Sequence, residues 1–187
     1  VCIPGPLYHN GPAVWSCQAL LNGLQVALLP RFDAAGTLAE IQKYKGSVLY
    51  MVPTMMKRIL RLPDEERFSY DLSSLRVVWH LAEPCPEWLK LAWIEWLGAE
   101  RIFELYAGTE AQVATVITGP EWMAHRGSVG RVVPGTVSIT DEDGNEVPVG
   151  EMGEVWMRSP RATPTYKYLG ATARTREGGW ESLGDMG

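Results

Sequence analysis

The sequence predicts an α/β fold: a mainly parallel sheet with flanking helices, followed by a smaller, barrel-like antiparallel β subdomain. Between residues 24 and 107, short apolar or β-branched runs alternate with helical stretches, as in βαβ units. After residue 126 the runs are short and alternating, and glycine and proline punctuate them. We therefore expect an α/β part at residues 1–118 and a β-rich subdomain of the same domain at residues 119–187.

The expected elements follow in order along the chain. Strands are expected at residues 25–30, 47–53, 75–81 and 101–107, and helices at residues 37–44, 54–60 and 86–98. The last helix has the clearest signals, because Pro86 suits a first turn and Gly98 suits a C-terminal stop. In the β-rich subdomain, Asp143-Gly144 predicts a hairpin turn.

Composition excludes several function classes. The 187 residues carry a formal net charge of −5 with no run of Lys or Arg, so the sequence offers no electrostatic footprint for nucleic acid. The 3 cysteines lack CxxC spacing, which indicates neither a disulfide framework nor a zinc site and favours a reducing, cytoplasmic location. No apolar run approaches the roughly 20 residues that span a bilayer.

Two polar loops follow predicted strands. "AEPCP" follows the strand 75–81, and "AGTE" follows the strand 101–107. Ligands of open α/β sheets bind beyond the carboxyl ends of the strands, so both loops are candidates for a ligand site. Gly108 permits close backbone approach, the Thr109 hydroxyl can donate to a phosphate, and the Glu110 carboxylate can hold Mg²⁺. Tyr106 offers a flat face for a purine.

The pair Thr109-Glu110 also has a simpler interpretation. Threonine is a common helix N-cap, and an acidic residue is favourable in a first helical turn. Taken alone, the pair favours this second interpretation, in which it only caps a following helix.

Six motifs decide between these interpretations by their order. They are "PLYHNG" (6–11), "HLAEPCP" (80–86), "ELYAGTEA" (104–111), "GSVGRVVPG" (127–135), "GEMGEVWMRSP" (150–160) and "GWESLGDMG" (179–187). In this order they resemble the signature motifs of the adenylate-forming (AMP-binding) superfamily, which includes acyl-CoA synthetases, luciferases and peptide-synthetase adenylation domains. "HLAEPCP" and "YAGTE" look most like the fatty-acid and other carboxylate CoA ligases.

The resemblance implies a nucleotide site. Its adenine side would be lined by Ala82, Glu83 and Pro84, and Tyr106 would stack on the base. The loop of Ala107, Gly108, Thr109 and Glu110 would follow, with Thr109 at the α-phosphate and Glu110 on Mg²⁺. Asp185 would hold the ribose diol, although taken alone it is better explained as a turn residue.

His9 lies in the motif that matches the edge of the acyl and phosphate channel. A direct role and a purely structural role for His9 remain equally open. Glu83 stands where a small residue is common beside the adenine, which could change nucleotide affinity.

The implied reaction is that of an ATP-dependent acyl-CoA synthetase. A carboxylate and ATP give acyl-AMP and pyrophosphate, and CoA then displaces AMP to form a thioester. The cofactors and substrates implied are ATP or AMP, Mg²⁺, CoA and a small carboxylate. Two alternatives stay open: a peptide-synthetase-type adenylation domain, and a non-catalytic nucleotide-binding module.

The chain resembles only the middle and end of the family's large N-terminal domain. The family's phosphate loop and its C-terminal domain, with the lysine that drives adenylation, are not in these 187 residues. We therefore expect the fragment alone to be inactive. An uncovered sheet edge and exposed apolar surface would lead it to self-associate or to be marginally stable.

Overall fold

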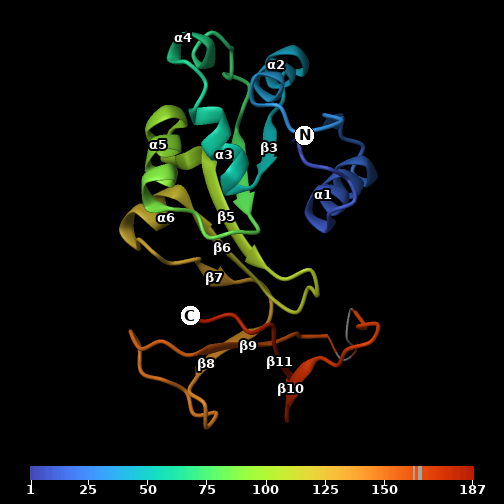
Figure 1. The fold of residues 1–187 in the computed structure, drawn as a ribbon, viewed down its shortest axis with the longest axis vertical. Helices are drawn as coiled ribbons and strands as arrows, with labels where there is room; N and C mark the ends of the chain where they lie inside the picture. The colour runs from blue at the N-terminus through green and yellow to red at the C-terminus, as the bar shows by residue number, and fades with distance from the viewer. Residues whose placement is uncertain (162, 164–165) are drawn as a thin grey trace. The chain divides into compact units, whose positions relative to one another are not determined.

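The computed structural model describes residues 1–161, 163 and 166–187, and these form two compact units (Figure 1). Unit 1 comprises Val1–Leu105 and Ile117–Gly130, and unit 2 comprises Tyr106–Val116 and Arg131–Gly187. The strands β5 and β6 therefore contribute residues to both units. Each unit has a core of its own.

The helices and strands are as follows. The helices are α1 (Asn10–Leu21), α2 (Ala34–Tyr44), α3 (Pro53–Leu60), α4 (Asp64–Arg67), α5 (Glu87–Leu97), the 3-10 helix η1 (Ala99–Arg101) and α6 (Gly119–Ala124). The strands are β1 (Cys2–Ile3), β2 (Ala27–Leu28), β3 (Val48–Met51), β4 (Val77–Leu81), β5 (Ile102–Ala107), β6 (Ala114–Thr118), β7 (Arg131–Val132), β8 (Thr136–Thr140), β9 (Glu154–Arg158), β10 (Arg174–Arg176) and β11 (Trp180–Ser182).

The strands form one sheet of seven strands, in the order β2-β1-β3-β4-β5-β6-β7, and one of four, in the order β10-β11-β9-β8. Strand β1 is parallel to β2 and β3, and the pairs β3–β4 and β4–β5 are also parallel. The pair β6–β7 and every pair of the second sheet are antiparallel. The predicted succession of a mainly parallel sheet and antiparallel β structure is confirmed.

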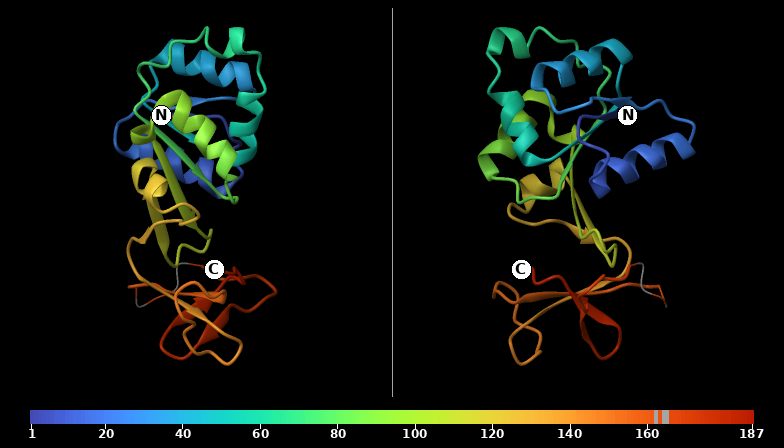
Figure 2. Two further views of the ribbon diagram at one scale, coloured as in Figure 1. Left: turned by 90° about the vertical axis from the view of Figure 1, so that its left-hand side faces the viewer. Right: turned by 45° about the vertical axis from the view of Figure 1, so that its right-hand side comes forward.

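The parallel sheet of unit 1 has helices on both faces (Figures 1 and 2). Helices α2, α3 and α5 cover one face, where Leu49, Val78 and Trp93 are fully buried together. Each such side chain contributes about 1.5–3 kcal/mol on burial. Because strand side chains alternate, this face is built by every second residue of β3 and β4.

The opposite face of this sheet carries a row of aromatic rings under α1. Tyr50, Trp79 and Phe103 are neighbours in register on β3, β4 and β5. Trp15 of α1 packs on this row, with ring centroids 5.8 Å from Tyr50 and 5.5 Å from Trp79. The row anchors the half-buried Trp15 of a helix whose buried residues, Pro12, Ser16 and Ala19, are small.

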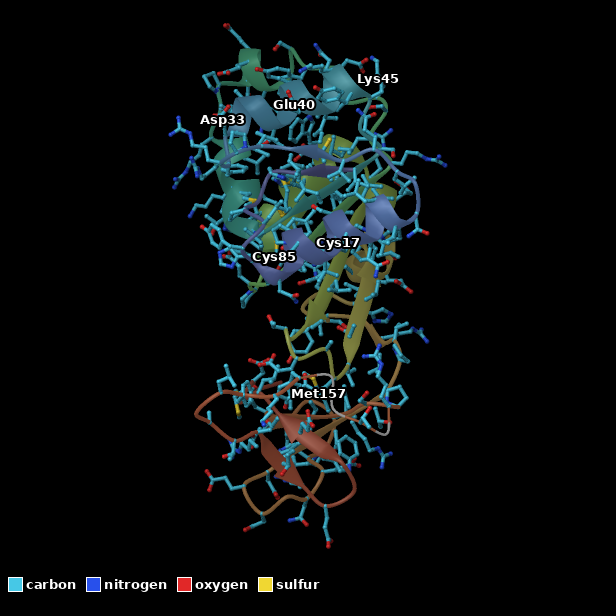
Figure 3. The ribbon with its side chains drawn as sticks, turned by 90° about the vertical axis from the view of Figure 1, so that its right-hand side faces the viewer. Cys17, Asp33, Glu40, Lys45, Cys85 and Met157 are labelled. Carbon is cyan, nitrogen blue, oxygen red and sulfur yellow. The ribbon has the colours of Figure 1, made fainter. Side chains whose placement is uncertain are left out.

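Helix α2 has a defined signal at each end. The Asp33 carboxylate caps its start by accepting from the Gly36 N–H at 2.6 Å, and Lys45 ends it in the left-handed conformation with φ 49°. Figure 3 labels both residues at the two ends of the helix. The turn that follows leads into β3.

Unit 2 is built on the antiparallel sheet. Val113, Val155 and Met157 are its buried apolar centre, and Figure 3 labels Met157 there. At the end of β8, the Asp141 carboxylate accepts from the Asn145 N–H at 2.8 Å, and Gly144 takes φ 90°. This confirms the turn predicted at Asp143-Gly144.

A buried ion pair joins α5 to β5 in unit 1. The ammonium group of Lys90 donates to the Glu104 carboxylate, and the side chains are only 2% and 11% exposed. The same ammonium lies 4.5 Å from the ring centroid of Trp122 on α6. Removing one partner of a buried pair leaves an uncompensated charge, which costs far more than the intact pair contributes.

We predict that Lys90→Met lowers the free energy of unfolding by about 3–5 kcal/mol, because Glu104 would remain buried and unpaired. The double variant Lys90→Met/Glu104→Leu should recover most of that loss. Urea denaturation followed by tryptophan fluorescence measures both.

The exposed pair of Arg126 and Glu87, with side chains 48% and 55% exposed, supplies the matched control. Arg126→Met should cost less than about 1 kcal/mol. An equal loss in Lys90→Met and Arg126→Met would show that burial adds nothing to the Lys90 pair.

Candidate functional site

The predicted site residues fall into two groups. Unit 2 holds Tyr106, Ala107, Gly108, Thr109, Glu110 and Asp185, and unit 1 holds His9, Ala82, Glu83 and Pro84. Within unit 2, the structure brings together residues from the two ends of its sequence.

The loop after β5 is a tight turn and not a helix start. The Ala111 N–H donates to the Gly108 carbonyl at 3.1 Å, so Thr109 and Glu110 occupy the middle of the turn. The chain then enters β6, and no helix lies between the turn and this strand. The interpretation of Thr109 as a helix N-cap is therefore wrong. The residues that do form a capping box are Thr118 and Glu121, at the start of α6.

Gly108 stands where the surrounding atoms leave no room for a side chain. A Cβ atom there would overlap the Cδ1 atom of Leu183, and would lie 3.0 Å from Oε2 of Glu110 and 3.5 Å from Oε1 of the buried Gln112. The glycine therefore lets the turn pack against the segment that leads to Asp185. It also leaves its own backbone open to close approach.

Asp185 is held at the end of the chain by β9. Its carbonyl accepts from the Val155 N–H at 2.9 Å, and the preceding Gly184 turns the chain with φ 86°. The Tyr106 hydroxyl donates to Oδ2 of Asp185 at 2.5 Å, which joins two residues 79 positions apart. Burial, together with the hydrogen bond and the charge of Asp185, raises the pKa of Tyr106.

Two further tyrosines reach this group of residues. The Tyr168 hydroxyl donates to Oε1 of Glu110 at 2.7 Å, and the Tyr166 hydroxyl donates to Oε2 of Glu181 at 2.9 Å. Sequence analysis did not identify Tyr166, Tyr168 or Glu181. The available signal was weak: two tyrosines two residues apart, shortly before the "GWESLGD" motif.

In unit 1, Ala82 directly follows β4 with φ 75°. A non-glycine residue with positive φ costs of order 1–3 kcal/mol, and such strain is concentrated at functional sites. The neighbouring Glu83 is exposed and its Oε2 accepts from the Thr54 hydroxyl at 3.1 Å. Pro84 is exposed as well. The backbone here is fixed in an unusual conformation, and its side chains face solvent.

His9 occupies the N-cap position of α1, but its side chain forms no capping hydrogen bond. The ring is exposed and packs only loosely against Tyr8, with centroids 4.8 Å apart. This geometry is compatible with a side chain that contacts a ligand.

Glu110 is a candidate ligand for Mg²⁺ carried by a nucleotide. The described residues contain no group of three or more His, Cys, Asp or Glu side chains that could hold a metal by themselves. Mg²⁺ does not need such a group, since it commonly takes one or two carboxylates and completes its shell with phosphates and water. A half-buried carboxylate on a tight turn fits Mg²⁺ carried by a nucleotide.

Comparison with known proteins gives the family. The family model described as AMP-binding enzyme matches residues 1–167, which is most of the chain. The chain belongs to the AMP-binding enzyme family.

Two relatives of this AMP-binding enzyme chain illustrate its range. It is 31% identical over 186 residues to indoleacetate–CoA ligase of Aromatoleum aromaticum, covering 97% of this chain and 36% of the relative. It is 30% identical over 187 residues to long-chain-fatty-acid–CoA ligase of Yersinia pestis, covering 97% and 32%. The chain thus spans about a third of the length of these relatives.

Among solved structures, the amide bond synthetase McbA of Marinactinospora thermotolerans matches with a TM-score of 0.85 and 28% identity, over 99% of this chain and 37% of that one. o-Succinylbenzoate CoA synthetase of Bacillus subtilis, solved with ATP and magnesium ion, matches with a TM-score of 0.81 and 22% identity, over 99% and 38%. The second likeness concerns the fold alone.

No helix in the described part of this AMP-binding enzyme is long and apolar enough to cross a membrane.

Two titratable groups beside the unit 1 loop are uncharged at physiological pH. Burial raises the pKa of the Cys85 thiol to about 12, so it is not a thiolate nucleophile. Burial and the charge of Lys90 lower the pKa of His80 to about 3, so His80 is neutral at physiological pH.

His80 predicts how stability depends on pH. Its pKa in the folded state, about 3, lies below the unfolded value of 6.5, so the unfolded chain binds more protons between these values. Stability should therefore be complete above pH 6.5 and fall as the pH drops. Between pH 7.5 and 5 the histidine should account for about 2 kcal/mol of unfolding free energy.

Denaturation curves of His80→Leu at both pH values test this, because the variant should lose about 2 kcal/mol less than the parent. The exposed His125 supplies the control variant His125→Gln, which removes a histidine from the surface. If His80→Leu and the parent change equally with pH, His80 is not the responsible group.

Proposed function

We propose that these residues belong to an ATP-dependent acyl-CoA synthetase and form part of its nucleotide site. The observation that carries the proposal is the meeting of Tyr106 and Asp185, 79 residues apart, beside the Gly108 turn. These groups match the three parts of a nucleotide: the aromatic ring could bind the base, the tight turn the phosphate and the carboxylate the ribose. The single family match across residues 1–167 supports treating residues 1–118 and 119–187 as two parts of one AMP-binding domain.

Each of these unit 2 residues has a distinct role in the proposal. The ring of Tyr106 stacks on adenine, and Asp185 accepts from the two ribose hydroxyls. A carboxylate suits this because its two oxygens have about four lone-pair sites, and Tyr106 uses one. The Thr109 hydroxyl donates to the α-phosphate. The backbone of Ala107 and Gly108 approaches the nucleotide closely.

Glu110 holds the Mg²⁺ that accompanies ATP. The ion, when bound, would offset the negative charge of the phosphates during attack at phosphorus. In the first reaction a carboxylate oxygen of the substrate bonds to the α-phosphorus, and the bond to pyrophosphate breaks. The residues of this chain orient the nucleotide for that attack and provide no covalent nucleophile.

In unit 1, Ala82, Glu83 and Pro84 line the adenine, mainly through backbone groups. The strained backbone at Ala82 supports this role, because a fixed unusual conformation presents backbone groups in a set direction. His9 contacts the acyl and phosphate channel. Its exposed ring supports this role.

In the second reaction the thiol of CoA attacks the acyl carbon, and AMP leaves. The names of the ligase relatives from Aromatoleum aromaticum and Yersinia pestis support CoA as the acceptor. The likeness to an amide bond synthetase supports a second candidate, in which an amine takes the place of the thiol. A full-length protein that contains these residues can be assayed with both acceptors.

We predict that Glu110→Gln lowers acyl-adenylate formation by the full-length protein about 100-fold, because the variant loses the charge that holds the cation at the reacting phosphates. Pyrophosphate release with a panel of carboxylates, before CoA is added, measures the step. The exposed Glu151 in the same unit offers a charge-matched control, and Glu151→Gln should keep the parental rate.

A near-parental rate in Glu110→Gln would remove Glu110 from the site. Absence of pyrophosphate release with every carboxylate would favour a non-catalytic nucleotide-binding module. Release that continues to an amide but not to a thioester would favour the amine acceptor.

A further inference from the structure

The backbone of Asp185 is fixed, so only its side chain is left to rotate. Its carbonyl accepts from the Val155 N–H at 2.9 Å, and Gly187 and Gly153 exchange two backbone hydrogen bonds, each 2.9 Å long. These bonds hold the end of the chain antiparallel to the start of β9. The position of the carboxylate therefore depends on the two side-chain torsions of Asp185.

The Tyr106 hydroxyl holds this side chain at one oxygen. It donates to Oδ2 of Asp185, and in the part of the chain that the structure describes no other group bonds this carboxylate. Asp185 is exposed, and a Cβ atom placed on the preceding Gly184 would meet no described atom within 4 Å. Oδ1 and the second lone pair of Oδ2 are thus open to a ligand.

The donor is itself held by the core of unit 2. The half-buried ring of Tyr106 packs against the apolar centre formed by Val113, Val155 and Met157. Burial, followed by the hydrogen bond to Asp185 and its charge, raises the pKa of Tyr106, so the hydroxyl keeps its proton at physiological pH. Because apolar contacts hold the ring, a phenylalanine in its place would keep the ring and lose only the donor.

A fixed carboxylate matters for the two hydroxyls of a ribose. These hydroxyls are neutral, so their bonds to a carboxylate depend strongly on distance and angle. An exposed aspartate that rotates freely must lose this freedom when a ligand binds, and the loss lowers affinity. Because Asp185 is already held at Oδ2, it presents its remaining lone pairs in a set direction before the ligand arrives.

We propose that the Tyr106 hydroxyl positions Asp185 for the ribose, and that the two residues together make the site selective for nucleotides that carry both ribose hydroxyls. The inference rests on the proposed function, which places the ring of Tyr106 on the base and Asp185 on the ribose. It gives the hydroxyl a role separate from that of the ring, because the hydroxyl acts only through Asp185.

The test compares two nucleotides on the full-length protein that contains these residues. AMP carries both ribose hydroxyls and 2′,3′-dideoxy-AMP lacks both, while the base and the phosphate are the same. Titration calorimetry gives the dissociation constant of each nucleotide, and the ratio of the two constants measures the preference for the ribose hydroxyls. Tyr106→Phe removes the proposed positioning group and keeps the ring.

We expect the parent to bind AMP more tightly than dideoxy-AMP. Tyr106→Phe should weaken AMP binding about 3–10-fold and leave dideoxy-AMP binding within about twofold of the parent, so the preference shrinks. Asp185→Ala should abolish the preference. Tyr166→Phe is the matched control, because it removes a hydroxyl of unit 2 that donates to a different carboxylate, that of Glu181. It should keep the parental ratio.

Each contrary outcome has its own meaning. A parental ratio in Tyr106→Phe, with no preference in Asp185→Ala, overturns the positioning role and leaves the proposed function intact. A parent without preference, or an Asp185→Ala variant that keeps it, removes Asp185 from the ribose and overturns the inference with that part of the proposed function. Equal losses for both nucleotides in Tyr106→Phe, or an equal fall of the ratio in Tyr166→Phe, show a general structural effect, which also overturns the inference.

Discussion

The buried pair of Lys90 and Glu104 is the constraint on which unit 1 depends most. Lys90 stands on the helix that follows the Ala82 loop, and Glu104 stands on β5, two residues before Tyr106. A buried ion pair adds little net stability, but it penalises every arrangement that separates the charges. The pair therefore fixes α5 against β5. The charge of Lys90 also adds to the larger effect of burial in lowering the pKa of the neighbouring His80.

Local periodicity explains which elements could be predicted. The strands β3, β4 and β5 are apolar and β-branched runs, and α5 has both its start and stop signals, so they appear where the sequence predicted them. Helix α1 has no amphipathic pattern: Gly11 and Pro12 lie in its first turn, and its buried residues are Pro12, Ser16 and Ala19. It is held by Trp15 on the aromatic row, a contact that only the fold creates. Helix α6 does carry a local sequence signal, the capping box of Thr118 and Glu121.

Only the residues of the candidate site that lie within sequence motifs could be predicted. Tyr106, Thr109 and Glu110 lie in one short stretch of sequence, and Asp185 lies in another, so a resemblance could mark them. The Tyr168 hydroxyl that donates to Glu110 comes from 58 residues away in the sequence, and only the fold brings the two together. Residue type and sequence spacing do not predict that Tyr168 and Glu110 form a hydrogen bond. The two-residue spacing of Tyr166 and Tyr168 hints at a shared face, but it does not name the acids that they meet.

In unit 2, tyrosine hydroxyls bind two carboxylates that are far from them in the sequence. Asp185 accepts a hydrogen bond from Tyr106, and Glu110 accepts one from Tyr168. At Asp185 the remaining lone pairs would serve neutral ribose hydroxyls, for which direction matters more than charge. In the proposed function Glu110 would meet a divalent ion, for which the charge of a ligand matters most. A basic partner would satisfy the first requirement and defeat the second, so a neutral phenol is the donor that suits both acids.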